Sequence, residues 1–173
     1  MNYADIRPID VANGPGIRVS LFVSGCTHHC KECFNPETWD FNYGKPFGED
    51  EIQTILGHLA KPYMKGLSLL GGEPFEPQNQ AAVLELARRV RERFPEKDIW
   101  CYSGFLFEAL AAGKVGEHSR EMLEQLDVLV DGPFVLEQKD LSLRFRGSAN
   151  QRILDVPASL KQGCAVEWDN NIE

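Results

Sequence analysis

The sequence has no hydrophobic run long enough to cross a membrane. A membrane-spanning helix needs about 20 consecutive apolar residues, and the apolar runs in this chain of 173 residues are all far shorter. The opening stretch, MNYADIRPIDVANG, also lacks the basic segment followed by an apolar segment that forms a secretory signal. We therefore expect no membrane span and a cytoplasmic, reducing environment.

Basic residues are also scarce. The chain has 18 Lys and Arg against 26 Asp and Glu, a net charge of -8. Because nucleic-acid phosphates are bound by clustered Lys and Arg, we expect no nucleic-acid partner. The one arginine cluster, Arg88, Arg89, Arg91 and Arg93, falls near the end of a predicted helix, where cations complement the helix dipole. We interpret it as a solvated helix end.

Paired cysteines, repeats and linkers are missing too. Five cysteines make an odd count, which argues against a disulfide framework. A chain of this length buries about 70% of its unfolded surface and needs no such framework to fold. With no internal repeat, low-complexity tract or long linker, residues 1–173 are predicted to form a single domain.

What the chain does have is an alternation of strand and helix patterns. Strands are predicted at 17–23, 66–70, 98–102 and 128–130, with weaker ones near Val135 and at 143–146. Helices are predicted at 49–61, 78–94, 105–112 and 119–125, the last with Ser119 as its N-cap. The tail after residue 155, with Cys164 and Trp168, is expected to pack as a further strand.

This alternation predicts an α/β fold with a parallel sheet covered by helices. A closed eight-unit barrel usually takes about 250 residues. The chain has room for only about six units, so we expect a partial, open (β/α)6-type TIM-like barrel. In such folds ligands bind at the carboxyl ends of the strands. The unusual segments of the chain follow predicted strands directly: 26–33, 71–74, 103–104 and 131–132.

The first of these segments contains three cysteines within a span of eight residues, in SGCTHHCKECFNPETW. The thiolates of Cys26, Cys30 and Cys33 can hold three corners of a 4Fe-4S cube and leave the fourth iron open to a ligand. Phe34 follows directly and either shields the cluster or packs in the core. This spacing points to chemistry at an open iron.

A structural zinc site is the alternative, with His28 or His29 as the fourth ligand. Such sites usually combine two ligand pairs, and the second pair is missing here. Cys101 and Cys164 are isolated in the sequence. We favour the iron-sulfur cluster and expect both histidines to be solvated loop residues.

The GGEP segment, which starts at Gly71, follows another strand. Two glycines allow a ligand to approach the backbone closely, and Glu73 can accept a hydrogen bond from a ligand ammonium group. A tight turn with an exposed glutamate would leave the same pattern. The segment is weak evidence alone and strong evidence beside the cysteine triplet.

The triplet and the strand-end GGE motif together resemble the radical S-adenosylmethionine (SAM) enzymes, whose open iron binds the amino and carboxylate groups of SAM. Further motifs narrow this resemblance, over about residues 2–155, to the glycyl-radical activases of anaerobic ribonucleoside-triphosphate reductases. These motifs are NGPGIR at 13–18, CFNPETW at 33–39, YSG at 102–104, LVDGPF at 129–134 and RFRGSANQ at 144–151. Two positions depart from the family: Tyr102 stands where Trp is frequent, and Leu70 where a small residue is common.

The resemblance implies an oxidoreductase that reductively cleaves SAM and generates a glycyl radical on the class III reductase. A low-potential donor such as flavodoxin or ferredoxin would supply the electron. It implies no catalytic side chain beyond the cluster and SAM, and it assigns the cluster to the three loop cysteines. The SAM contacts that it implies are Gly71, Gly72, Glu73, Ser103 and Gly104 on the ribose side, Asp131 and Arg146.

Some assignments stay open at this point. Asp131 is equally suited to a turn before Gly132. Arg146, Ser148 and Asn150 are candidates to close over SAM or to meet the partner, whereas Arg144 and Arg146 also fit a solvated strand edge. Because no sequence is left for a small-molecule substrate domain, we expect a peptide segment of another protein as substrate. The alternatives are another small radical SAM enzyme (a pyruvate formate-lyase activase or a deazaguanine-type synthase) and a non-catalytic zinc-binding module.

Overall fold

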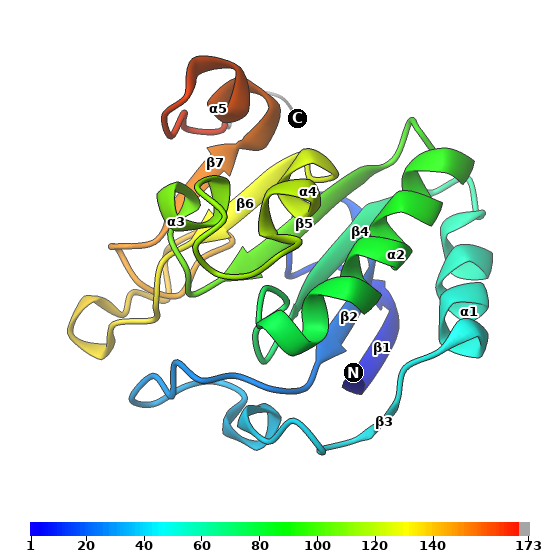
Figure 1. The fold of residues 1–173 in the computed structure, drawn as a ribbon, viewed down its shortest axis with the longest axis horizontal. Coiled ribbons are helices and arrows are strands. Elements are labelled where there is room, and N and C mark those ends of the chain that lie inside the picture. The colour runs from blue at the N-terminus through cyan, green and yellow to red at the C-terminus, as the bar shows by residue number, and fades with distance from the viewer. Residues whose placement is uncertain (170–173) are drawn as a thin grey trace.

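A seven-stranded sheet runs through residues 1–169, the part of the chain that the computed structural model describes (Figure 1). Its strand order is β3-β1-β2-β4-β5-β6-β7. The strands are β1 (Asn2–Asp10), β2 (Ile17–Val23), β3 (Lys45–Pro46), β4 (Met64–Gly71), β5 (Asp98–Ser103), β6 (Val128–Asp131) and β7 (Arg152–Asp155). The fold is mixed α/β, as the alternating pattern predicts.

The centre of the sheet is parallel. Strands β2, β4, β5 and β6 pair in one direction, with Leu21, Leu69, Cys101 and Leu129 in one register row. Strands β1, β3 and β7 are antiparallel to their neighbours. Within residues 1–169, four strands are therefore parallel, not the six expected. No α-helix crosses over between β1 and β2 or between β6 and β7, which is why these pairs can run antiparallel.

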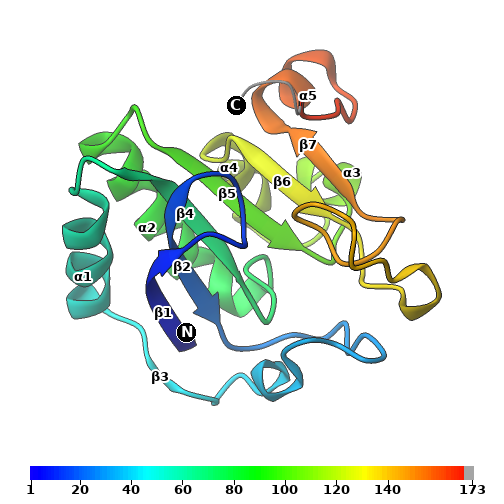
Figure 2. The same cartoon turned by 180° about the vertical axis from the view of Figure 1, so that it is seen from behind.

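The helices are α1 (Glu49–Leu59), α2 (Pro77–Arg93), α3 (Phe107–Ala111), α4 (Ser119–Glu124) and α5 (Val156–Gln162), with 3-10 turns at Pro36–Trp39 and Leu136–Gln138. Helices α1, α2 and α4 lie in front of the sheet in Figure 1. In Figure 2, which shows the molecule from behind, the strands are nearer the viewer than α2 and α4. No helix in the described chain is long and apolar enough to cross a membrane.

The main core lies between these helices and one face of the sheet. In α1, Ile52, Ile55, Leu56 and Leu59 recur at helical spacing and are buried. The strands contribute alternate residues to the same cluster, such as Val19 and Leu21 of β2, Leu67 and Leu69 of β4, and Ile99 and Cys101 of β5. The expected amphipathic helices thus fold where their apolar faces can be buried.

The opposite face of the sheet has a different composition. It carries Arg18, Ser20 and Phe22 on β2 and the aromatic residues Trp100 and Tyr102 on β5. The fully buried Arg18 guanidinium forms an ion pair with Asp98 at 2.6 Å. No α-helix covers this face in Figure 2; loops and the C-terminal segment lie over it.

The last part of the chain differs from the prediction. The weak strands expected near Val135 and at 143–146 are wrong, because Val135 precedes a 3-10 turn and Phe145 has a φ of 61°, outside the extended region. The strand in this region is β7 instead. The possible strand edge with Arg144 and Arg146 is therefore not present.

The strand expected in the tail is also wrong. Helix α5 follows β7 directly, and Glu167 forms only an isolated bridge with Leu154. Trp168 packs edge-on against Trp100 with ring centroids 5.0 Å apart, while Cys164 is exposed. The expected tail of residues 156–173 extends beyond the described residues, which end at 169.

Two predictions about helix ends need correction. Ser119 does not cap α4: His118 is the N-cap residue, and the Ser119 hydroxyl donates to the Leu110 carbonyl at 3.0 Å. The arginines of α2 are not simply a solvated end. Arg89 forms two hydrogen bonds to Glu49 of α1, and Arg91 pairs with Asp127. These ion pairs connect α2 to its neighbours.

Candidate functional site

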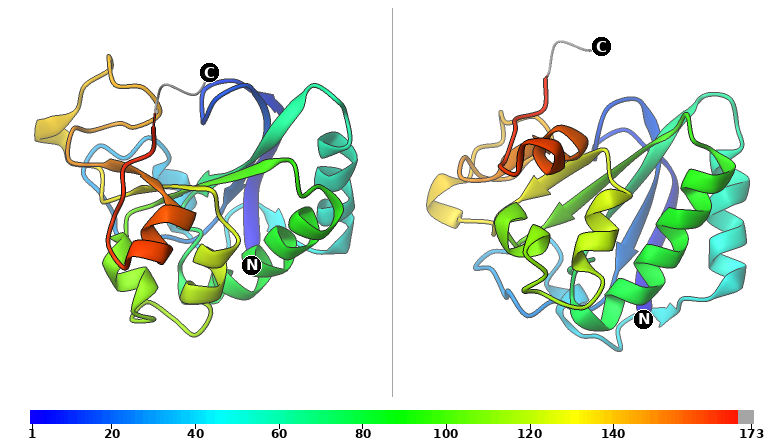
Figure 3. Two further views of the ribbon diagram at one scale, coloured as in Figure 1. Left: turned by 90° about the horizontal axis from the view of Figure 1, so that it is seen from above. Right: turned by 45° about the horizontal axis from the view of Figure 1, so that its top comes forward.

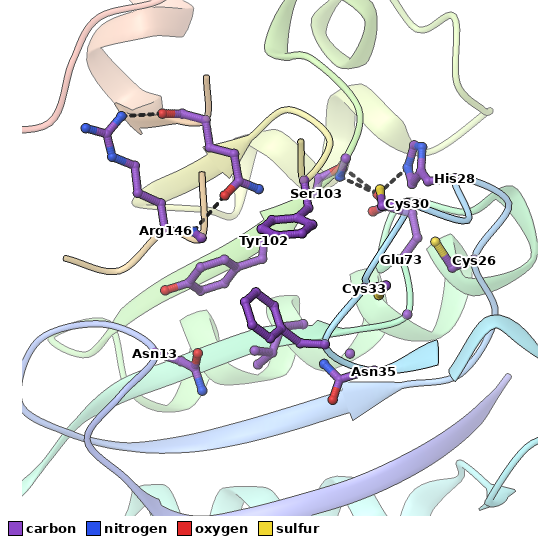
Figure 4. Close-up of a pocket in the computed structure, with 18 of the residues that line it drawn as sticks. Asn13, Cys26, His28, Cys30, Cys33, Asn35, Glu73, Tyr102, Ser103 and Arg146 are labelled. Carbon is purple, nitrogen blue, oxygen red and sulfur yellow. Dashed lines mark hydrogen bonds and ion pairs between the residues drawn. The ribbon is translucent and has the colours of Figure 1, made fainter. Parts of the chain in front are cut away.

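A cavity of about 530 Å³ lies at the carboxyl ends of the parallel strands (Figure 4). Nine of the ten site residues predicted from the sequence line it, and the tenth, Asp131, does not. The nine are Cys26, Cys30, Cys33, Gly71, Gly72, Glu73, Ser103, Gly104 and Arg146. Segments that are up to 120 residues apart in sequence therefore meet here, because the parallel strands all end at this edge.

The cysteine loop leaves the sheet at the end of β2 and closes on itself. Its base is held by two backbone hydrogen bonds, from Gly25 N to Thr38 O at 2.7 Å and from Cys26 N to Trp39 O at 3.2 Å. Inside the loop, His29 and Glu32 have positive φ angles of 48° and 60°. The backbone thus bends at both residues, and all three cysteines border the cavity.

All three loop cysteines are free thiols. Cys26 is buried, and burial raises the pKa of its thiol to about 11. Burial also raises the pKa of Cys30, which is half-buried. Metal binding to such thiols must release their protons. Cys101 is fully buried on the helix-covered face and Cys164 is exposed, so neither belongs to this site.

Thiolates suit both iron-sulfur clusters and zinc, so the geometry around them matters. In residues 1–169, no three His, Cys, Asp or Glu side chains converge as the ligands of a single metal ion would. A 4Fe-4S cube has a different requirement, because each cysteine binds a separate iron and the sulfurs stay apart. All three thiols border one cavity, as the ligand set of such a cube requires.

The first half of the cysteine loop is fixed to the segment that follows β4. The Glu76 carboxylate accepts hydrogen bonds from both the backbone N and the hydroxyl of Thr27, at 2.7 and 2.6 Å. Asn79 donates to the carbonyls of Ser24 and Glu73, at 3.0 Å each. Glu76 and Asn79 are both buried. The position of Cys26 therefore depends on the segment that starts with the GGEP motif.

Glu73 lies at the centre of this arrangement with an exposed fraction of only 1%. Its Oε1 accepts from His28 Nε2 at 2.8 Å, from the Ser103 hydroxyl at 3.0 Å and from Gly104 N at 2.7 Å (Figure 4). Its Oε2 accepts from Phe75 N at 2.9 Å. A carboxylate offers about four acceptor sites. Oε1 is therefore saturated, and a ligand ammonium group can bind this oxygen only by replacing one of its three donors.

His28 is not the solvated loop residue that the sequence suggests. Its side chain is 18% exposed, and its hydrogen bond to Glu73 raises the pKa of the imidazole. The ring packs edge-on against Phe105, with centroids 4.4 Å apart. A Cβ at position 104 would stand 2.7 Å from this ring, so Gly104 leaves the space that His28 fills. No sequence signal indicates this contact across 45 residues.

The glycines of the GGEP motif have a role within the chain itself. Gly71 has a φ of +109°, and a Cβ there would lie 2.5 Å from the backbone nitrogen of Val23. A Cβ at Gly72 would lie 2.7 Å from the Gly25 carbonyl oxygen. Both residues also line the cavity. The motif thus permits close packing of the end of β4 against the start of the cysteine loop.

Asp131 lies away from the cavity and is fully buried. Its carboxylate accepts hydrogen bonds from the Arg152 guanidinium at 2.5 and 2.9 Å and from Phe107 N at 2.8 Å. Arg152 also pairs with Glu108. These bonds hold the end of β6 against α3 and β7. The next residue, Gly132, lines the cavity in place of Asp131.

The RGSANQ block folds upon itself beside the cavity. The Arg146 guanidinium donates to the Gln151 carbonyl at 2.5 Å, and the Ser148 hydroxyl donates to Asn150 Oδ1 at 2.6 Å. Asn150 Nδ2 and Gln151 Nε2 donate to the carbonyls of Pro133 and Gly132, respectively. This block therefore shapes the loop after β6, which runs beside the cysteine loop in Figure 3.

Aromatic residues supply much of the remaining lining. Phe34 is 60% exposed and packs against Phe134 at 5.1 Å, so it is not a core residue. Trp39 stacks on His29, with centroids 4.4 Å apart. Within the described chain, Trp39 Nε1 and the Tyr102 hydroxyl are buried without a hydrogen-bond partner. Burial also raises the pKa of Tyr102. Trp39 is the last residue of the CFNPETW motif and Tyr102 the first of the YSG motif, and the sequence predicts neither as a ligand contact.

Known proteins resemble this chain over nearly its whole length. A family model described as a 4Fe-4S single cluster domain matches residues 12–154. The chain is 45% identical over 155 residues to the anaerobic ribonucleoside-triphosphate reductase-activating protein of Vibrio cholerae, covering 88% of this chain and 97% of that protein. The proteins of the same name from Escherichia coli K12 and Enterobacteria phage T4 are each 43% identical, covering 96% and 93% of their own lengths.

The chain belongs to the family of anaerobic ribonucleoside-triphosphate reductase-activating proteins. The matched range of the 4Fe-4S family includes the three loop cysteines and all four parallel strands. Of the residues that border the cavity, all but Arg7 of β1 lie inside the matched range.

Proposed function

We propose that this protein is a radical SAM activase that generates a glycyl radical on an anaerobic, class III ribonucleoside-triphosphate reductase. The observation that carries the proposal is the gathering of three free thiols and the strand-end motif residues around one cavity. The names of the relatives support the choice of target. A low-potential electron donor such as flavodoxin or ferredoxin and a cytoplasmic location complete the proposal.

Cys26, Cys30 and Cys33 would hold the 4Fe-4S cluster. All three border the cavity, and no further cysteine does, so the protein would provide three of the four iron ligands and leave one iron open. When bound, the reduced cluster and SAM supply a 5′-deoxyadenosyl radical, which can abstract a hydrogen atom from glycine. The two hydrogen bonds from Thr27 to the Glu76 carboxylate would keep Cys26 in place during this chemistry.

The SAM pocket would be formed by the other motif residues. Gly71 and Gly72 leave the backbone accessible, and Glu73 would accept the ammonium group in exchange for its bond from His28. The other three donors to Glu73 are two backbone N–H groups and the hydroxyl of the short Ser103 side chain, which can move less than the His28 ring. His28 is therefore the donor that suits this exchange. Ser103 and Gly104 would line the ribose side, and Arg146 would border the mouth. Asp131 would act only indirectly, by holding the strand end next to Gly132.

The four parallel strands and their helices would form part of an open TIM-like barrel. The cavity on the face that no helix covers offers a route for a segment of another protein, which fits a protein substrate. The exposed Leu141 and Phe34, at 86% and 60%, border the cavity and would meet that partner first.

Anaerobic reconstitution with iron and sulfide, followed by reduction in the presence of SAM and the reductase, tests the proposal. We expect 5′-deoxyadenosine and a glycyl radical signal in electron paramagnetic resonance. Absence of both would refute it. Turnover of a small molecule without a protein partner would instead establish a different small radical SAM enzyme. Colourless protein with stoichiometric zinc and no SAM cleavage would establish the zinc module.

A further inference from the structure

The Tyr102 hydroxyl is a buried hydrogen-bond donor without a partner in residues 1–169. Tyr102 lies on β5 and borders the cavity. A buried hydroxyl without a partner is costly, and such groups are uncommon in folded proteins. A missing acceptor next to a cavity indicates that the occupant of the cavity supplies it.

The carboxylate that acts on Tyr102, that of Asp10 on β1, is already engaged. Asp10 accepts hydrogen bonds from the Ser20 hydroxyl at 2.6 Å, from Asn13 Nδ2 at 2.7 Å and from Ala12 N at 2.8 Å. Tyr102 is close enough to Asp10 for the carboxylate to influence its pKa, yet no hydrogen bond forms between them. The carboxylate on this part of the sheet is therefore not the missing acceptor.

Figure 4 shows where the hydroxyl points. The Tyr102 side chain extends away from the cysteines and toward the end of the cavity where Asn13 lies. Phe22, Leu143 and Phe145 border the same cavity. Of the residues proposed for SAM, Gly71 to Glu73, Ser103 and Gly104 surround the cysteine end, whereas Arg146, whose guanidinium is bound to the Gln151 carbonyl, is drawn on the Tyr102 side. The hydroxyl therefore points away from the residues proposed to hold the ammonium group and the ribose of SAM.

We propose that the Tyr102 hydroxyl donates a hydrogen bond to a backbone carbonyl of the partner segment that carries the target glycine. This inference rests on the proposed function. Glycine has no side chain, so a protein can hold it only through its backbone, and a fixed O–H donor suits a peptide carbonyl. Burial raises the pKa of the phenol, which keeps it protonated as a donor.

The test is Tyr102→Phe in the reconstituted protein, with a fluorescent synthetic peptide copied from the glycine-bearing segment of the reductase. We expect the dissociation constant of the peptide and the KM for the reductase to rise about 3- to 10-fold, the effect of one hydrogen bond to a neutral carbonyl. Iron content and SAM affinity should stay as in the wild type. Since the lost oxygen has no partner, thermal stability should not fall.

The matched control is Tyr63→Phe, because Tyr63 is 51% exposed in the turn before β4 and does not border the cavity. It should leave peptide binding unchanged. Tyr102→Phe with unchanged peptide affinity, or with weakened SAM binding in its place, would overturn the inference. Failure of the wild-type protein to cleave SAM would overturn the proposed function instead, so the two failures can be told apart.

Discussion

The two faces of the central strands differ in composition. On the helix-covered face, Val19, Leu21, Leu67, Leu69 and Leu129 are all apolar and fully buried. On the cavity face, the same strands carry residues that form hydrogen bonds or border the cavity: Arg18, Ser20, Ser68, Leu70 and Tyr102. Because side chains alternate along a strand, β2, β4 and β5 serve both purposes, whereas Val128 and Val130 of β6 form a second apolar cluster with Trp100. Residues that stabilise the core and residues that face the cavity are thus direct neighbours along these strands.

If this separation holds, the largest functional effect comes from a residue outside the core. Cys30→Ala should abolish cluster binding and leave the fold intact, because Cys30 is only half-buried and belongs to the cysteine loop. Iron and sulfide content after anaerobic reconstitution measures the first effect, and circular dichroism measures the second. Cys101→Ala, on the helix-covered face, is the control and should retain the cluster. A fully loaded Cys30 variant would contradict the ligand assignment.

Adjacent leucines of β4 test the two faces directly. Leu69 is fully buried under the helices, so Leu69→Ala should lower the free energy of unfolding by about 3–5 kcal/mol, including the cost of a closed cavity. Leu70 borders the existing cavity, so Leu70→Ala should cost only about 2 kcal/mol, the transfer term alone. Urea denaturation measures both. Equal costs would mean that the two faces are packed alike.

The smallest effect is expected on the surface, away from both faces. Hydrogen bonds from Arg89 lower the pKa of Glu49 from its ordinary value of 4.5 to about 2. A lowered pKa gives stability that is present above 4.5 and is lost as the pH falls toward about 2. Arg89→Gln should therefore lower the melting temperature slightly at neutral pH and not at all at the lowest pH. A difference that persists there would show that Arg89 acts by packing.

The sequence was sufficient for residues whose position follows from strand ends. The cysteine triplet, the GGEP motif and Ser103-Gly104 each follow a strand of the parallel sheet, and parallel strands end together. The sequence was insufficient where a contact depends on side-chain direction. His28 reaches Glu73 across 45 residues, and Asp131 turns to Arg152 rather than to the cavity. No local sequence pattern indicates where these two side chains point.

Strand β1 was missed for a related reason. Most of its residues are exposed or half-buried, so it lacks the apolar alternation that marks a buried strand. The RGSANQ block was expected to meet a ligand or partner, but most of its polar groups bond to one another or to Gly132 and Pro133. Composition alone cannot separate a loop that binds a ligand from one that binds itself.

The most direct test of the account is a crystal structure of the anaerobically reconstituted protein with SAM. We predict a 4Fe-4S cluster bound by Cys26, Cys30 and Cys33, SAM at the cysteine end of the cavity with its ammonium group on Glu73, and His28 moved off that carboxylate. The Tyr102 end should remain open. A cluster with a fourth protein ligand, or SAM bound outside the cavity, would contradict the account.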